Sequence, residues 1–166
     1  ASGINVVRDR ATPLHAGGFV SQKGETVRVG IWDEGCLSPT HPEAMAARDY
    51  RCQDGAFVSS HGSHCLCTIM APGVDPFALG MSPNVSSYGY DWRDDEIEKR
   101  TAFDPQGLAL ELSSNSYGYE NGCYYDDSTG WSTLGLFWFG AYDINSYIED
   151  MLASDYPNTL SVWAAG

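Results

Sequence analysis

Two histidines and two cysteines lie close together in SSHGSHCLCTIMAPG, residues 59–73. Side chains of these types serve metal binding, disulfide formation or nucleophilic catalysis. His61 and His64 are three positions apart and share a helix face, but Cys65 and Cys67 do not complete a tetrahedron with them. No second ligand pair at zinc-finger spacing follows. The spacing therefore predicts no metal ligand here, and disulfide formation and catalysis stay open.

The elements that would position these residues alternate between strands and helices. Apolar and β-branched runs bounded by turn residues predict strands. Caps, helix stops and a helical period predict helices, with Ser60 as the N-cap of the helix that carries the histidines and Pro72-Gly73 as its stop. Alternation of this kind indicates an α/β domain with a largely parallel sheet flanked by helices. The strands are expected within 26–35, 84–92 and 159–166, and the helices within 59–73, 93–103 and 143–154.

The last predicted helix has the clearest period. Asp143 can cap it, and an apolar residue recurs at i, i+3, i+4, i+7 and i+8. These residues should face the core. They are Ile144, Tyr147, Ile148, Met151 and Leu152.

Polar or small residues follow three of the apolar runs. Asp33 ends the first strand, residues 115–118 (Asn-Ser-Tyr-Gly) follow a second apolar run, and residues 164–166 (Ala-Ala-Gly) end the last strand. Ligands and catalytic groups of parallel α/β folds gather at the carboxyl ends of the strands. A cleft is therefore expected at this edge of the sheet.

Composition limits the function classes. A chain of 166 residues suits one core, and its formal net charge of −13 disfavours nucleic acid and anionic lipid as partners. No apolar run is long enough for a membrane span, and we expect no signal peptide within these residues, because no basic segment followed by an apolar one opens the sequence. Five cysteines favour a secreted or extracytoplasmic setting.

Several segments together resemble the subtilisin-like serine peptidases (subtilases). GIWDEG resembles their first catalytic motif, and SHGSHCLCTIMAPG resembles the second, in which His-Gly-Thr-His opens a helix. GMSPNVSSYGYDW is similar to the stretch that follows, SSNSYG to the substrate-binding strand, and LSVWAAG to the strand that leads to the oxyanion-hole Asn. The matches keep the family's order from about residue 26 to 166, with His61 28 positions after Asp33.

The resemblance implies a three-layer subtilisin-like fold and a catalytic role for two residues. His61 would take the proton of a serine nucleophile and return it to the leaving amine, while Asp33 would hold the imidazole and stabilise its cation. Their side chains should lie within hydrogen-bond reach, roughly 2.6–3.2 Å. An extended peptide substrate would lie against Ser116, Tyr117 and Gly118, with Ala164, Ala165 and Gly166 as the opposite wall of the pocket.

The chain departs from the family pattern at several points. Ser63, Leu66 and Cys67 replace the usual Thr, Ala and Gly of the second motif, and no serine lies in a Gly-Thr-Ser-x-Ala motif. We therefore expect residues 26–166 to be the N-terminal part of the catalytic domain, with residues 1–25 as an extension packed on it. A complementary C-terminal chain or portion would carry the nucleophilic Ser. The alternative is a catalytically inactive module of the same fold that binds or assembles.

Cofactors and cysteine pairs receive separate expectations. The chemistry requires no cofactor. Asp126-Asp127 and the set Asp91, Asp94 and Asp95 lack the alternating spacing of a calcium loop, which favours a solvated acidic face and leaves structural calcium open as the alternative. Cys65 and Cys67 point about 200° apart on a helix, so each should stay reduced or pair with a distant cysteine such as Cys52.

Overall fold

The computed structural model describes residues 27–46, 49–55, 57–118, 122–134 and 140–164. The predicted extension 1–25 lies outside the described residues, as do Ala165 and Gly166. Within the described part, no helix combines the length and the apolar character that crossing a membrane would require.

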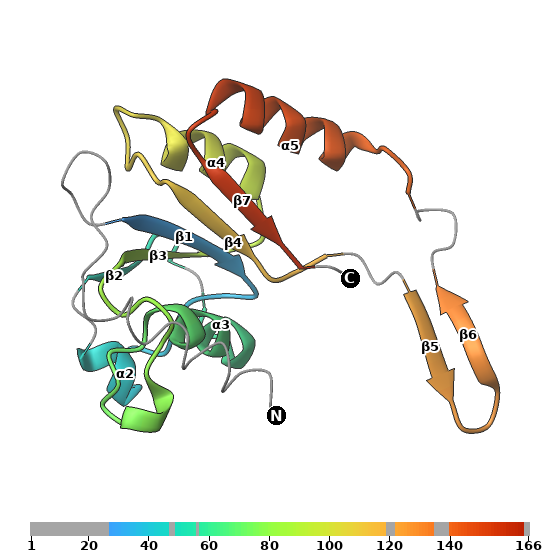
Figure 1. Ribbon diagram of the computed structural model, residues 1–166, viewed down its shortest axis with the longest axis horizontal. Coiled ribbons are helices and arrows are strands. Elements are labelled where there is room, and N and C mark those ends of the chain that lie inside the picture. The colour runs from blue at the N-terminus through green and yellow to red at the C-terminus, as the bar shows by residue number, and fades with distance from the viewer. Residues whose placement is uncertain (1–26, 47–48, 56, 119–121, 135–139, 165–166) are drawn as a thin grey trace.

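Five parallel strands form the main sheet, in the order β2-β3-β1-β4-β7 (Figure 1). The register aligns Trp32 of β1 with Asn115 of β4, and Asn115 with Trp163 of β7. The carboxyl ends of these three strands therefore meet at one edge, as expected from the sequence. The strands are β1 (Arg28–Asp33), β2 (Tyr50–Cys52), β3 (Ser86–Asp91), β4 (Leu112–Asn115) and β7 (Leu160–Trp163).

Helices cover both faces of this sheet and make three layers (Figure 1). One apolar cluster joins the sheet to α3 through Ile31, Leu66 and Met70. A second cluster joins the other face to α4 and α5, and the predicted α/β class is confirmed. The helices are α2 (Pro42–Ala46), α3 (Ser60–Met70), the 3-10 helix η1 (Pro76–Ala78), α4 (Asp95–Phe103) and α5 (Ile144–Asp155).

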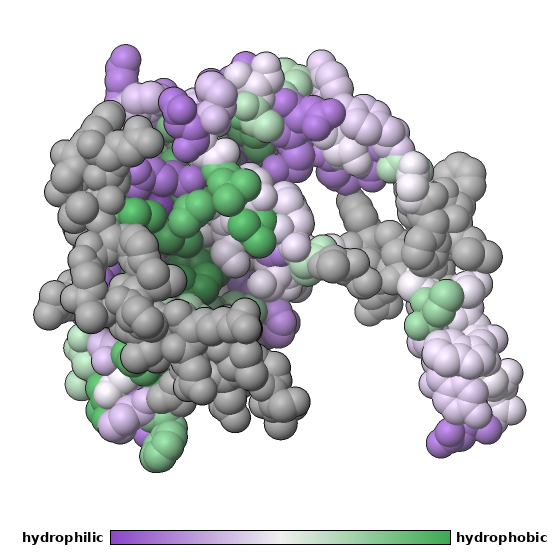
Figure 2. All heavy atoms as spheres, viewed as in Figure 1, coloured by the Kyte–Doolittle hydropathy of each residue, from purple (hydrophilic) through white to green (hydrophobic). Residues whose placement is uncertain are grey.

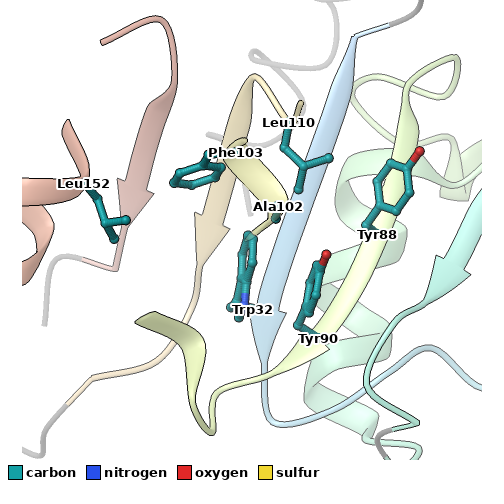
Figure 3. Close-up of a cluster of buried hydrophobic side chains, with 7 residues drawn as sticks. All are labelled: Trp32, Tyr88, Tyr90, Ala102, Phe103, Leu110 and Leu152. Carbon is teal, nitrogen blue, oxygen red and sulfur yellow. The ribbon is translucent and has the colours of Figure 1, made fainter. Parts of the chain in front are cut away.

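The second cluster anchors the end of β1. Trp32 is fully buried, stacks on Tyr90 with ring centroids 4.3 Å apart, and meets the edge of Phe103 at 6.1 Å. Figure 3 shows these rings between the strands and α4, with Leu110 and Leu152 beside them. Because Trp32 precedes Asp33, its packing fixes the backbone that presents the Asp33 carboxylate.

All predicted strands and helices exist, with small corrections. Ser59 rather than Ser60 caps α3, since the Ser59 hydroxyl accepts from the Gly62 N–H at 3.1 Å. Asp143 caps α5 as predicted, by accepting from Ser146 N–H at 2.9 Å.

The predicted buried face of α5 is only half right. Leu152 is buried and Ile148 packs against the core, but Ile144 and Tyr147 are 65% and 50% exposed. The residues of α5 that pack in or against the apolar cluster, Ile148 and Leu152, lie beyond its first turn, and the first turn stays exposed.

An antiparallel hairpin between β4 and α5 was not predicted. It consists of β5 (Gly122–Asp126) and β6 (Gly130–Leu134) and extends away from the main sheet (Figure 1). Asp126 accepts hydrogen bonds from the N–H groups of Ser128 and Thr129 at 2.8 and 3.0 Å, which forms its turn. The carboxylate that suggested calcium thus serves the turn of the hairpin.

Candidate active site

The Asp33 carboxylate lies buried at the carboxyl end of β1. Its Oδ1 accepts a hydrogen bond from Glu34 N–H at 2.7 Å and lies 2.6 Å from His61 Nδ1. The second distance meets the expectation for a hydrogen-bonded pair. Asp33 Oδ2 is also buried and has no hydrogen-bond partner among the described residues. The pair thus uses only one of the two carboxylate oxygens.

His61 occupies the first turn of α3, where close backbone packing fixes it. A Cβ added at Gly62 would lie 2.1 Å from the carbonyl oxygen of Gly35, so only glycine allows this approach. The Ser59 hydroxyl caps the helix and also donates to Glu34 Oε2 at 2.7 Å. Both contacts tie the start of α3 to the loop that follows β1.

The two members of the pair have opposite environments. The Asp33 side chain is 1% exposed, whereas the His61 side chain is 55% exposed and open to a reactant. The hydrogen bond to Asp33, followed by the charge of that carboxylate, raises the pKa of His61 above its ordinary value. With Nδ1–H donating to Asp33, the neutral ring leaves Nε2 free as a proton acceptor.

A free thiol lies beside this pair. Cys65 follows His61 by one helical turn, and its Sγ lies 3.9 Å from His61 Nδ1. Burial raises the pKa of the Cys65 thiol, the Asp33 carboxylate adds to this effect, and the Ser116 hydroxyl opposes it. The structure therefore brings Cys65 and Ser116 to the Asp33–His61 pair. The i, i+4 spacing of His61 and Cys65 was the only sequence signal for this thiol.

The described residues of the expected substrate-binding segments flank the same edge of the sheet. Ser116 and Tyr117 are partly buried and Gly118 is exposed, directly after β4. Ala164 follows β7, and its N–H donates to the Asn115 carbonyl at 2.9 Å. Ala165 and Gly166 lie outside the described residues, so only part of the predicted opposite wall is placed.

A buried lysine connects these two segments. Lys99 of α4 is 0% exposed, and its Nζ lies 2.8 Å from Asp95, 2.9 Å from Glu149 and 3.4 Å from the Tyr117 hydroxyl. The same Nζ lies 4.1 Å from the ring centroid of Trp163. Tyr117 belongs to one of the two expected pocket walls, and Trp163 directly precedes the other. In the sequence, Lys99 lies among the charged residues of the predicted helix 93–103, a pattern typical of a surface helix, and nothing there predicts its burial.

Of the two expected outcomes for Cys65 and Cys67, a reduced thiol or a disulfide to a distant cysteine, the structure shows the reduced thiol. Cys36 pairs with Cys52, while Cys65, Cys67 and Cys123 are free. Cys65 and Cys67 do not bridge each other, and Cys52 is not available to either.

Within the described ranges, donor atoms of three or more residues converge in two places. One is Asp33, His61 and Cys65, and the other is Cys36, Cys52 and Asp54, where the disulfide occupies both sulfurs. The acids that suggested calcium are in neither group. A structural calcium site remains a prediction.

Comparison with known proteins supports the fold. No family model and no curated protein matches the chain. Solved structures do match, among them the self-cleaved protease domain of PatA, at TM-score 0.55 and 22% identity, and the prenylagaramide maturation protease PagA, at TM-score 0.53 and 18% identity. Each match covers 84% of this chain, but only 49% and 46% of the respective structures. The chain thus shares the fold of these protease domains and spans about half of their length.

Proposed function

We propose that this chain is the N-terminal part of a subtilisin-like serine endopeptidase catalytic domain and supplies its Asp and His. The observation that carries the proposal is the 2.6 Å contact between Asp33 Oδ1 and His61 Nδ1. A buried carboxylate holds a half-exposed imidazole through Nδ1, which leaves Nε2 for proton transfer. The fold shared with two protease domains agrees with this function.

The nucleophilic Ser would come from a complementary C-terminal portion or chain. Support comes from β7, where Leu160 and Val162 are 59% and 53% exposed. In Figure 2, hydrophobic side chains gather over the strands β4 and β7. Native proteins usually cover such an apolar strand. The missing portion would cover it and place the Ser near His61 Nε2.

The substrate would be a peptide or protein in extended conformation. It would pair with the backbone of Ser116, Tyr117 and Gly118, and Ala164, Ala165 and Gly166 would complete the pocket. Main-chain pairing of this kind supplies affinity, and side-chain pockets supply preference. We also propose an oxidising, extracytoplasmic location, which the disulfide between Cys36 and Cys52 supports.

A fluorophosphonate probe tests the nucleophile. The probe should label a serine outside residues 1–166. If that serine belongs to a separate polypeptide, the labelled polypeptide should stay bound to this chain until both are denatured. His61→Ala should abolish labelling, while His64→Ala, an exposed residue on the same helix, should leave it intact. Labelling within residues 1–166 would show that the nucleophile is wrongly assigned. A folded, complete protein that resists the probe would instead favour the inactive binding module.

A further inference from the structure

We propose that Asp33, His61 and Cys65 form a site for a thiophilic divalent cation, with Zn²⁺ as the type, which competes with the Asp33–His61 hydrogen bond. Their carboxylate, imidazole and thiol donor atoms all lie within 4.8 Å of one another. Two of the residues come from one turn of α3 and the third from the end of β1. This set therefore differs from the one that the sequence spacing disfavoured, in which all the ligands came from the helix within 59–73.

Each donor has an atom available for the ion. Asp33 Oδ2 is buried without a hydrogen-bond partner among the described residues, so it can bind a cation while Oδ1 keeps the Glu34 N–H. Cys65 is outside the disulfide and partly exposed. The His61 ring is half exposed. The ion can therefore enter from the solvent side.

The distances fit zinc after small movements. Zinc bonds of about 2.0–2.3 Å in a tetrahedron place ligand atoms roughly 3.3–3.7 Å apart. Cys65 Sγ and His61 Nδ1 are 3.9 Å apart and need to approach slightly. His61 Nδ1 also lies 2.6 Å from Asp33 Oδ1, and this hydrogen bond is lost when Nδ1 gives up its proton and binds the ion. A water molecule would complete the tetrahedron.

Binding changes the protonation of the site. The Cys65 thiol proton goes to solvent, and the ring proton of neutral His61 moves from Nδ1 to Nε2, so that Nδ1 can bind the ion. Nε2 then donates rather than accepts, and it cannot act as a base. This consequence, inhibition, rests on the proposed peptidase function, whereas the metal site itself does not.

The donor set also sets the preference among ions. Thiolate and imidazole ligands suit Zn²⁺, Co²⁺ and Cd²⁺, whereas Ca²⁺ and Mg²⁺ prefer oxygen ligands only. We expect millimolar Ca²⁺ or Mg²⁺ to leave the site empty. Retention of Zn²⁺ binding in their presence separates this site from an acidic cation-binding surface.

Co²⁺ provides a direct test on the protein with every portion that accompanies this chain. A thiolate-to-cobalt charge-transfer band should appear, and Zn²⁺ should displace it. Cys65→Ser should weaken Co²⁺ binding at least tenfold, while Cys67→Ser, a free cysteine two positions along α3, should change it less than twofold. A wild-type protein without the band, or an unchanged Cys65→Ser variant, would overturn the site.

Two further measurements separate the possible failures. In the unmodified protein, saturating Zn²⁺ should slow iodoacetamide alkylation of Cys65 at least tenfold and that of Cys67 much less; equal protection would contradict the site even if a variant misfolds. In an active enzyme, Zn²⁺ should inhibit wild type at concentrations that fill the Co²⁺ site. Full activity at saturating Zn²⁺ would refute the inhibitory effect, whereas metal binding in a protein without peptidase activity would refute only the proposed function.

Discussion

Lys99→Met should destabilise the protein strongly, although Lys99 belongs to a helix of charged residues. The substitution keeps most of the side-chain volume and removes the charge between Asp95 and Glu149. Removal of one partner from a buried ion pair costs about 3–5 kcal/mol. The two carboxylates are 26% and 25% exposed, so solvent screens the charges that remain and the lower end applies. We expect a loss of about 3 kcal/mol in the free energy of unfolding.

Arg100→Met is the matched control. Arg100 is the next residue of α4 and pairs with Asp155 at 3.1 Å, but their side chains are 33% and 51% exposed. An exposed pair contributes between 0 and about 1 kcal/mol. Urea denaturation of both variants at one pH measures the difference directly, with an unchanged m-value as the check on two-state unfolding.

The double variant Lys99→Met/Glu149→Gln tests whether the loss comes from the unpaired carboxylate. Part of the stability should return, since Glu149→Gln removes a charge left without its partner. Additive effects within about 0.5 kcal/mol would show that the residues do not interact. Equal losses in Lys99→Met and Arg100→Met would refute the reasoning from burial.

Four other outcomes follow from the same structure. Under the proposed function, the raised pKa of His61 means that kcat/KM of the complete protein should increase with pH through a value above about 6.5, since His61 must be neutral to accept a proton. Asp33→Asn should lower that pKa and reduce kcat on the order of 10⁴-fold in a pH–rate series. The same raised pKa makes the pair's contribution to stability complete at low pH and lost as pH rises through the folded-state pKa of His61. Burial raises the pKa of Glu98 to about 7, so the wild-type protein should lose stability as pH rises from about 4.5 to 7. Glu98→Gln should therefore increase Tm relative to wild type more at pH 8 than at pH 5 in a thermal melt. Gly62→Ala places a Cβ 2.1 Å from the Gly35 carbonyl and should cost on the order of 2 kcal/mol in urea denaturation, with loss of the Asp33–His61 contact in a crystal structure; a fully stable variant would contradict the packing described at the start of α3.

Local sequence patterns predicted the main elements because each was consistent with its surroundings. The apolar run before Asp33 forms β1, and the residues from Ser59 to Met70 form a capped helix, with the cap misplaced by one position. The hairpin of β5 and β6 was missed even though residues 126–130 (Asp-Asp-Ser-Thr-Gly) contain a turn signal. Its strands carry aromatic residues on both sides of that turn, and the acids of the turn were interpreted as a solvated face or a calcium site.

Contacts between distant segments were beyond sequence patterns. Lys99 has the sequence surroundings of a surface residue, yet α5 and the segment after β4 enclose it. The i, i+4 spacing predicts that Cys65 and His61 share one face of a helix. The packing of α3 against β1 is what brings Asp33 to both residues, and the spacing does not contain that information. In the same way, the exposure of Ile144 depends on which elements lie beside α5, and no periodicity contains that information.

The orientation of His61 is determined by backbone packing more than by its own side-chain contacts. Its ring is half exposed, so side-chain burial alone would allow several rotamers. The position of the ring instead follows from Trp32, which fixes the end of β1, and from Gly62, which lets α3 approach the Gly35 carbonyl. The Asp33 carboxylate then selects one ring orientation. An imidazole held in this way stays open to solvent, as the proposed base requires, and the Cys65 thiol beside its Nδ1 supplies the further donor of the proposed metal site.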